Sequence, residues 1–432
     1  MKKLNSFLTL ALGTAILITF SGCLKDKCES TITYLVYKPV YVKMDEVRND
    51  LRTEAPRALK KPGNIYVYGD YLFVAEQREG IHVIDNSDPS NPTSVSFIKI
   101  PGCENMAVRG NILYANSYVD LVSLNISNPQ SVQLVCRTND MFEPLALYED
   151  LGYLVYYEPT NETVERPCDS PVYFYEDFGG WGGPGRKDVL FVNSSFDNNA
   201  AGSESNGNAP AGVGGSMARF TLAANRLYSV GTYDLKVFGL NGEGCATLNN
   251  TIQVGWGIET IFPYQDKLFI GSSSGMFIYD NSNPDQPTQL AAFAHARACD
   301  PVYVSGNTAY VTLRDGNECA GFVNQLDVVN ITNITNPVLL KSYPMHNPHG
   351  LSISDDNLFL CEGDQGLKIF DASEWAKIDQ RLLSHQNEFF AFDVITLGDK
   401  KLAIVIGKEG LRQLDYTDPA QPRELSLIPV QQ

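Results

Sequence analysis

Residues 80–89 read Gly80-Ile81-His82-Val83-Ile84-Asp85-Asn86-Ser87-Asp88-Pro89. The first six residues suit a β-strand, and the run from Asp85 to Pro89 suits a turn, because Asp, Asn and Ser bond the local backbone and proline presets a dihedral angle. Copies of this strand begin at Gly275, Gly366 and Gly410, and looser copies begin at Asp120, Asp188, Asp234 and Gln325. A period of roughly forty residues in an all-β pattern predicts a propeller or a β-solenoid.

Each copy is the third strand of a longer repeat. The strand before it carries a pair such as Leu72-Phe73, and the first strand alternates apolar residues, as at Ile65 and Val67. A fourth strand follows the turn, over residues 93–98 in the first repeat. Four antiparallel strands of this kind make a propeller blade. We therefore predict an all-β fold, a β-propeller of eight four-stranded blades over residues 63–430, with seven blades as the alternative if one repeat is atypical.

Two regions interrupt the spacing of the repeats. Residues 157–187 form an insertion within the third repeat. Residues 194–215 are rich in Asn, Gly and Ser, which predicts a mobile loop. Residues 23–62 precede the first repeat and are expected to form a linker with a strand over 31–43 and a short helix over 44–52.

The N-terminus has the pattern of a secretory signal. Lys2 and Lys3 precede an apolar run over residues 7–20, and Ser21-Gly22-Cys23 follows. We predict that residues 1–22 are a lipoprotein signal peptide and that Cys23 becomes the lipidated first residue. The expected location is the cell envelope, as an outer membrane lipoprotein held by its lipid anchor. The periplasmic face and the cell surface both remain open.

Charge and cysteine content limit the partners and the compartment. The formal net charge of −17 would repel a phosphate backbone, so no nucleic-acid partner is expected. Nine cysteines in an exported chain suggest disulfides. Cys299 and Cys319 lie near each other on the predicted face and are the candidate pair, while the remaining pairing stays open.

The repeats resemble the LVIVD repeat, a β-propeller repeat of secreted bacterial proteins. The resemblance rests on Gly80 to Pro89 and its copies and covers roughly residues 63–429. With the signal and Cys23, the chain is most similar to LVIVD-repeat lipoproteins of Bacteroidota. The resemblance implies a surface or periplasmic binding or scaffold role, and no enzymatic activity follows from it.

One aligned position at the start of the first strand is rich in carboxylates. The innermost strands line a propeller's channel, so this position predicts a ring at one mouth, on the face that also carries residues 157–187 and 194–215. Carboxylates there could bind a cation or another ligand. Equally, each could cap backbone N–H groups at a blade junction. The candidate residues are Glu104, Glu143, Glu259, Asp300, His349 and Asp393.

Three functions remain in competition. The leading hypothesis is a lipid-anchored propeller that binds a protein or glycan partner through the face with the insertion. The second is a polysaccharide hydrolase or lyase that uses two mouth carboxylates, although no motif selects the pair. The third is a structural propeller with Ca²⁺ in the channel mouth. No catalytic residue and no other cofactor is predicted, whether a metal binds stays open, and a binding module is favoured over an enzyme.

Overall fold

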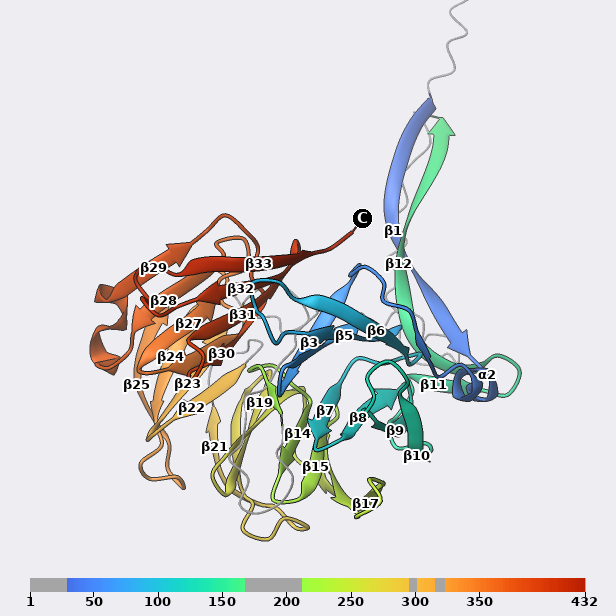
Figure 1. Cartoon of the computed structure of the whole chain (residues 1–432), viewed down its shortest axis with the longest axis horizontal. Helices are drawn as coiled ribbons and strands as arrows, with labels where there is room; N and C mark the ends of the chain where they lie inside the picture. Colours follow the sequence, from blue (N-terminus) through green and yellow to red (C-terminus); the bar gives the residue numbers. More distant parts are fainter. Residues whose placement is uncertain (1–28, 168–211, 295–300, 315–322, 432) are drawn as a thin grey trace, which may run out of the picture. The chain divides into compact units, whose positions relative to one another are not determined.

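The structure is a computed structural model that describes residues 29–167, 212–294, 301–314 and 323–431. Their regular elements are strands, apart from two short helices, α2 (Met44–Asn49) and the 3-10 helix η1 (Trp375–Gln380). Most strands form antiparallel four-stranded meanders, so the predicted all-β propeller fold is confirmed (Figure 1). The chain divides into two compact units, one of residues 1–40 and 156–190 and one of residues 41–155 and 191–432.

The repeats, numbered 1 to 8 along the chain, each correspond to one sheet. Seven of them contain four consecutive antiparallel strands. Repeat 1 has β3 (Pro62–Tyr68), β4 (Tyr71–Glu76), β5 (Gly80–Asp85) and β6 (Thr93–Lys99), with β2 (Arg52–Glu54) and β13 (Val213–Gly214) added at its two edges. Repeat 2 has β7 (Met106–Arg109), β8 (Ile112–Ser117), β9 (Asp120–Asn125) and β10 (Gln133–Thr138). Repeat 4 has β14 (Phe220–Ala223), β15 (Arg226–Val230), β16 (Asp234–Leu240) and β17 (Ala246–Gln253).

The second half of the chain is more regular. Repeat 5 has β18 (Ile258–Tyr264), β19 (Lys267–Ser272), β20 (Gly275–Asp280) and β21 (Thr288–Ala294). Repeat 6 has β22 (Val302–Ser305), β23 (Thr308–Leu313), β24 (Gln325–Asn330) and β25 (Val338–Pro344). Repeat 7 has β26 (Leu351–Ser354), β27 (Asn357–Cys361), β28 (Leu367–Asp371) and β29 (Leu382–Gln386). Repeat 8 has β30 (Asp393–Leu397), β31 (Leu402–Gly407), β32 (Gly410–Asp415) and β33 (Arg423–Pro429).

Repeat 3 departs from this pattern. Its strands β11 (Ala146–Tyr148) and β12 (Gly152–Pro167) share a three-stranded sheet with β1 (Glu29–Val42), in the order β1-β12-β11. Eight sheets are thus described, as many as the repeats, but the third is not a four-stranded blade, because β12 continues beside β1 where a blade would turn back. Residues 157–167 of the expected insertion are therefore strand, and residues 168–187 lie outside the described part of the chain.

The smaller unit contains the paired parts of β1 and β12. Lys38 Nζ lies 2.9 Å from a carboxylate oxygen of Glu162, and the hydroxyls of Thr33 and Thr163 are 3.0 Å apart. Both contacts join the two strands along their length. Tyr34, Leu35 and Tyr37 are exposed, so this ribbon is held by pairing rather than by a core.

The innermost strands of the larger unit follow one another in a closed series. Contacts run from β3 through β7, β14, β18, β22, β26 and β30, and β31 returns to β3. The amides of Asn86 and Gln413 exchange two hydrogen bonds of 2.8 and 2.6 Å across this closure. The N–H of Gln431 also donates to the carbonyl of Leu59 at 2.8 Å. The end of repeat 8 is thus fastened to repeat 1, and apolar side chains fill the spaces between neighbouring sheets.

The turn motif of the sequence acts as the turn chemistry predicts. The side chain at the end of the third strand accepts the backbone N–H two residues later, an Asx turn. Distances range from 2.8 to 3.2 Å at Asp85, Asn125, Asp280, Asn330, Asp371 and Asp415. The prolines within three of these turns also expose carbonyls that accept hydroxyl groups of a neighbouring repeat, in the pairs Ser96–Pro129, Tyr228–Pro284 and Ser426–Pro89.

The last residues of the expected mobile loop are fixed against the innermost strands. The N–H of Gly212 donates to the carbonyl of Val108 at 2.9 Å, and β13 pairs with β3. The Ser216 hydroxyl donates to Asp393 at 3.3 Å and accepts the N–H of Leu351 at 2.9 Å. Residues 212–216 therefore contact repeats 1, 2, 7 and 8. The mobility predicted for residues 194–215 stays a prediction, and residues 194–211 lie outside the described ranges.

Candidate functional site

Two of the six predicted ring residues are buried within the protein. His349 has an exposed fraction of 3%, and Arg314 donates to its Nδ1 at 3.0 Å. Burial, together with the charges of Arg314 and Lys408, holds the pKa of His349 well below its usual value, so its imidazole is neutral at pH 7. Asp393 has no exposed surface and accepts the Ser216 hydroxyl. His349 thus contacts repeat 6, and Asp393 contacts the segment that precedes repeat 4.

The other predicted ring residues differ in their burial and in their hydrogen-bond partners. Glu259 is half-buried in β18, and its backbone carbonyl accepts Arg219 Nε at 3.2 Å. Glu104 pairs with Arg78 Nε at 2.9 Å, while Glu143 is exposed. Asp300 lies outside the described residues, as do Cys299 and Cys319, the candidate disulfide. The structure thus brings Glu104 and Glu143 to one pocket, and a ligand role for the whole ring stays a prediction.

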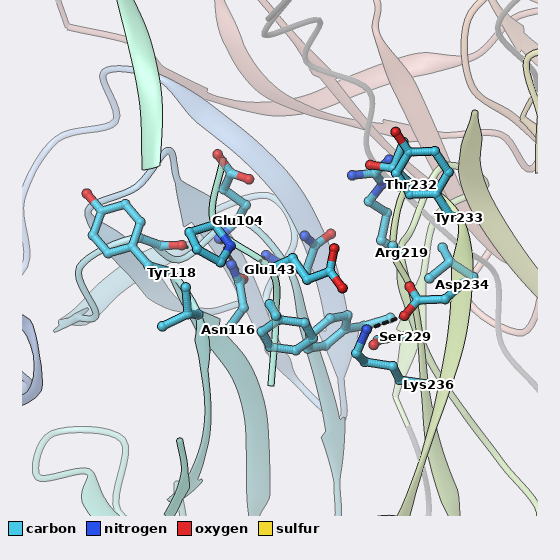
Figure 2. A pocket seen from close by; sticks show the side chains of 18 of the residues that line it. Glu104, Asn116, Tyr118, Glu143, Arg219, Ser229, Thr232, Tyr233, Asp234 and Lys236 are labelled. Carbon is cyan, nitrogen blue, oxygen red and sulfur yellow. Dashed lines mark hydrogen bonds and ion pairs between the residues drawn. The ribbon is translucent and has the colours of Figure 1, made fainter. Parts of the chain in front are cut away.

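That pocket opens between repeats 2 and 4, where repeat 3 leaves the series of blades. Its volume is about 410 Å³, within the range of small-ligand pockets. Glu104, Asn116 and Tyr118 line one side, and Arg219, Ser229, Thr232, Tyr233, Asp234 and Lys236 line the other, with Glu143 between them (Figure 2). Starts of first strands and loops between second and third strands therefore meet here, as the alternation of strand direction predicts.

The charged groups of the pocket balance one another. Three carboxylates, Glu104, Glu143 and Asp234, face three cations, Arg78, Arg219 and Lys236. Arg78 pairs with Glu104, and Lys236 pairs with Asp234. The guanidinium of Arg219 donates to the carbonyls of Ile258 and Glu259 at 2.8 and 3.2 Å. The pocket is consequently polar but close to neutral, in a chain with a net charge of −17.

One exposed aromatic side chain lines this pocket, and a second one contacts it. Tyr233 lines it and is 42% exposed, and Trp256 is 69% exposed. Their ring centroids are 4.9 Å apart in an edge-to-face arrangement. Neither residue was predicted, although the Gly255-Trp256-Gly257 run between two strands is a signal that sequence reasoning could have used.

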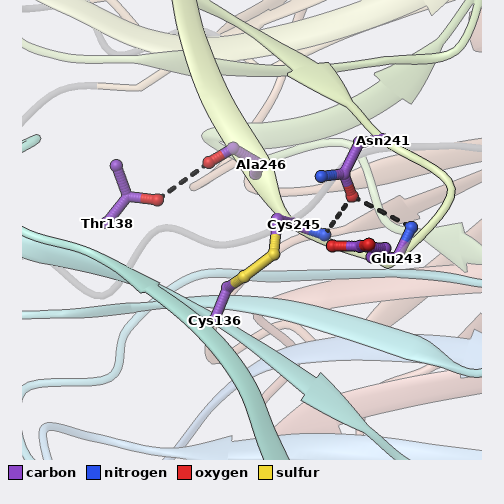
Figure 3. Close-up of a disulfide and its surroundings, with 6 residues drawn as sticks. All are labelled: Cys136, Thr138, Asn241, Glu243, Cys245 and Ala246. Atoms are coloured by element: carbon purple, nitrogen blue, oxygen red, sulfur yellow. Dashed lines mark hydrogen bonds between the residues drawn. A yellow bond between two sulfur atoms is a disulfide. The ribbon is translucent and has the colours of Figure 1, made fainter.

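A disulfide joins repeats 2 and 4 at their outer strands. Cys136 of β10 bonds Cys245, which precedes β17, with a Cα–Cα distance of 5.4 Å (Figure 3). The Thr138 hydroxyl donates to the carbonyl of Ala246 at 2.8 Å beside it. Near the disulfide in sequence, Phe142 packs against Phe220 of repeat 4, with ring centroids 5.7 Å apart.

The described residues give no support to a metal centre or a membrane-spanning helix. Within them, no group of three or more His, Cys, Asp or Glu side chains is arranged to hold a metal ion. The calcium hypothesis therefore stays a prediction, and the described residues do not support it. Likewise, no described helix is long and apolar enough to cross a membrane. Cys103 and Cys361 are buried free thiols, and burial raises the pKa of both.

Comparison with known families supports the repeat assignment. A model of the LVIVD repeat matches residues 61–98 and 296–344. Both segments are thus similar to the LVIVD repeat. The first spans β3 to β5 and nearly all of β6, and the second spans repeat 6. None of the curated proteins matches the sequence.

Solved structures with the same fold include two bacterial proteins. The periplasmic gluconolactonase PpgL of Pseudomonas aeruginosa superimposes with a TM-score of 0.54 at 10% identity, over 88% of this chain and 96% of that one. A protein of Bacteroides fragilis NCTC 9343, to which a 6-phosphogluconolactonase activity is ascribed, gives 0.52 at 8% identity, over 87% and 93%. At these identities the likeness concerns the propeller fold alone.

Proposed function

We propose that this chain is a lipid-anchored binding module of the bacterial cell envelope, whose LVIVD-repeat propeller holds a ligand or partner group in the pocket between repeats 2 and 4. The observation that carries the proposal is the pocket itself, which lies where the regular repeat is interrupted. Repeat proteins bury their faces against neighbouring repeats, so an interruption is where a surface can specialise.

The contrast with the rest of the predicted ring supports this location. Arg314 donates to His349, and Ser216 donates to Asp393. His349 and Asp393 are both buried, so neither presents surface to a ligand. The pocket, by contrast, combines hydrogen-bonding groups of both kinds with the exposed ring of Tyr233, which is the composition of small-ligand and interface sites.

A variant that fills the pocket tests this proposal. Thr232 is exposed at the lining, so Thr232→Trp would occupy the space without changing a buried residue. We expect saturable binding of the purified protein to a protein, polysaccharide or membrane-vesicle fraction of a bacterial envelope, measured by biolayer interferometry. The affinity should fall at least about tenfold in Thr232→Trp and persist in Thr232→Ser. Equal binding by all three proteins would remove the pocket from the proposal.

The anchor is part of the same proposal, with Cys23 as the acylated residue of a Bacteroidota-type lipoprotein. We expect the full chain to incorporate labelled palmitate and to fractionate with membranes. The Cys23→Ser variant should lose the label and appear in the soluble fraction, because a protein without acyl chains has little membrane affinity. Label retained by Cys23→Ser would show that acylation is elsewhere. A wild-type chain that is never labelled would remove the anchor.

A further inference from the structure

The pocket between repeats 2 and 4 has the chemistry of a carbohydrate site. We infer that its ligand is a neutral saccharide, stacked on the aromatic pair Tyr233 and Trp256 and hydrogen-bonded to the polar lining. This inference rests on the proposed binding function and names its ligand class. It goes beyond the fold, which by itself selects no ligand.

The aromatic pair is built in advance of binding. The N–H groups of Val254 and Gly255 both donate to the carbonyl of Tyr233, at 3.0 and 3.3 Å. The N–H of Ile258 donates to the carbonyl of Thr232 at 3.0 Å. These bonds tie residues 254–258 to the backbone at Tyr233, so the backbone that carries the two rings needs little further ordering when a ligand binds.

A glycine makes this loop possible. Gly257 has a φ of +67°, and a Cβ there would collide with the Ser273 hydroxyl, while the N–H of Ser273 donates to the Gly257 carbonyl at 2.8 Å. The sharp turn leaves the preceding Trp256 in water at 69% exposure. An exposed tryptophan in contact with a residue of the pocket lining offers a surface for stacking.

The charge balance decides between ligand classes. An anionic ligand would need a surplus of cations, but Arg78 and Lys236 are already paired with carboxylates and Arg219 is bound to two carbonyls. The net charge of −17 would also repel anions. A cationic ligand could stack on the rings, yet two of the three carboxylates are paired and the charge of Arg219 offsets that of Glu143.

Neutral hydroxyl groups fit this lining better. Each sugar hydroxyl both donates and accepts a hydrogen bond, and the pocket offers both, from the carboxylate of exposed Glu143 to the Thr232 hydroxyl. The C–H groups of a sugar ring carry slight positive charge and pack on the electron-rich face of an aromatic ring. A neutral saccharide therefore satisfies the polar lining and the exposed rings together.

The test uses the mature chain with three sets of probes. These are neutral oligosaccharides of glucose, galactose and mannose, oligosaccharides of uronic acids, and choline chloride. We expect retention of neutral oligosaccharides, with the dissociation constant of the best of them, measured by calorimetry, raised at least about tenfold in Trp256→Ala and in Tyr233→Ala. Trp375→Ala is the matched control, because Trp375 is an exposed tryptophan of η1 in repeat 7, whereas Trp256 contacts Tyr233 of the pocket lining, and this variant should bind as wild type does.

The outcomes separate the ligand class from the binding function. Uronic-acid or choline binding that is lost in Thr232→Trp would overturn the neutral-saccharide inference and leave the binding module intact. Neutral-saccharide binding unchanged in Trp256→Ala and Tyr233→Ala would also overturn it. If no neutral oligosaccharide binds, the neutral-saccharide inference is overturned. The proposed binding function is overturned as well only if the envelope fractions bind wild type and Thr232→Trp equally.

Discussion

Replacing Asp120 by asparagine is expected to lower the free energy of unfolding by about 3–5 kcal/mol, because it removes a buried charge that two arginines share. Asp120 has no exposed surface and accepts Arg48 Nε at 2.8 Å, Arg48 Nη2 at 2.9 Å and Arg137 Nη1 at 3.1 Å. The N–H of Asp140 also donates to it at 3.0 Å. An asparagine would offer one oxygen to these four donors and turn its own N–H groups toward cations.

The same carboxylate holds α2 against repeat 2. Arg48 lies in α2, whose Met44 and Val47 pack on Val119, the residue before Asp120. The helix has six residues, too few to be stable alone, so its position depends on this contact. Loss of the charge is therefore expected to release α2 as well as to weaken repeat 2.

Acidification should remove the same contribution. Burial alone would raise the pKa of Asp120, but hydrogen bonds and charge from Arg48 and Arg137, with the Asp140 N–H, outweigh it and lower the pKa. A carboxyl whose folded pKa is depressed stabilises the fold above its unfolded pKa of about 3.9, and this is lost as the pH falls through the folded pKa. The difference between wild type and Asp120→Asn should be full at pH 7 and shrink below about pH 4.

Asp140→Asn is the matched control. Its carboxylate is exposed and lies 3.3 Å from Arg48 Nη2, so the identical substitution should change the free energy of unfolding by at most about 1 kcal/mol. Urea denaturation of the three proteins at pH 7 and pH 3.5 gives both comparisons. Equal losses in the two variants, or a difference that grows in acid, would contradict the role given to Asp120.

Repeat geometry was predictable because it depends on neighbours in sequence. The run from Gly80 to Pro89 encodes a strand and an Asx turn through alternation and local side-chain bonds, and the same chemistry operates at Asp280 and Asp415. Contacts between distant segments have no comparable pattern in the sequence. β12 pairs with β1, and Arg48 pairs with Asp120, although these segments are far apart in the sequence. The period of the repeat carries no information on which distant segments fit together.

At the aligned carboxylate position, equivalence within the repeat does not predict the role of each residue. Glu104 and Asp393 occupy the same place in their repeats, so alignment predicts the same role. Arg78 from the preceding repeat pairs with Glu104 at the pocket, whereas Ser216, from the segment that runs along the innermost strands, covers Asp393. The partners come from outside the repeat, so equivalent residues acquire different environments. Of the aligned positions that the structure describes, Glu104 of repeat 2 and Glu143 of repeat 3 line the pocket.

Removing the disulfide between Cys136 and Cys245 is expected to lower the free energy of unfolding by about 4–5 kcal/mol. The two cysteines are 109 residues apart, and a cross-link that closes so long a loop restricts the unfolded chain by about that amount. The bridge also spans the seam at which repeat 3 leaves the propeller, where the hydroxyl of Thr138 donates to the Ala246 carbonyl. Reduction should therefore loosen repeats 2 and 4 before the others.

The Cys136→Ser/Cys245→Ser variant measures this contribution by urea denaturation, with Thr138→Val as the control at the same seam. Loss of one neutral hydrogen bond should change the free energy of unfolding by about 1 kcal/mol, well below the effect of the double variant. Hydrogen exchange should rise first in β10 and β17, because local opening begins where the cross-link was lost. A loss no larger than that of Thr138→Val would mean that the packing of Phe142 against Phe220 holds the seam, and that the pocket beside it does not depend on the disulfide.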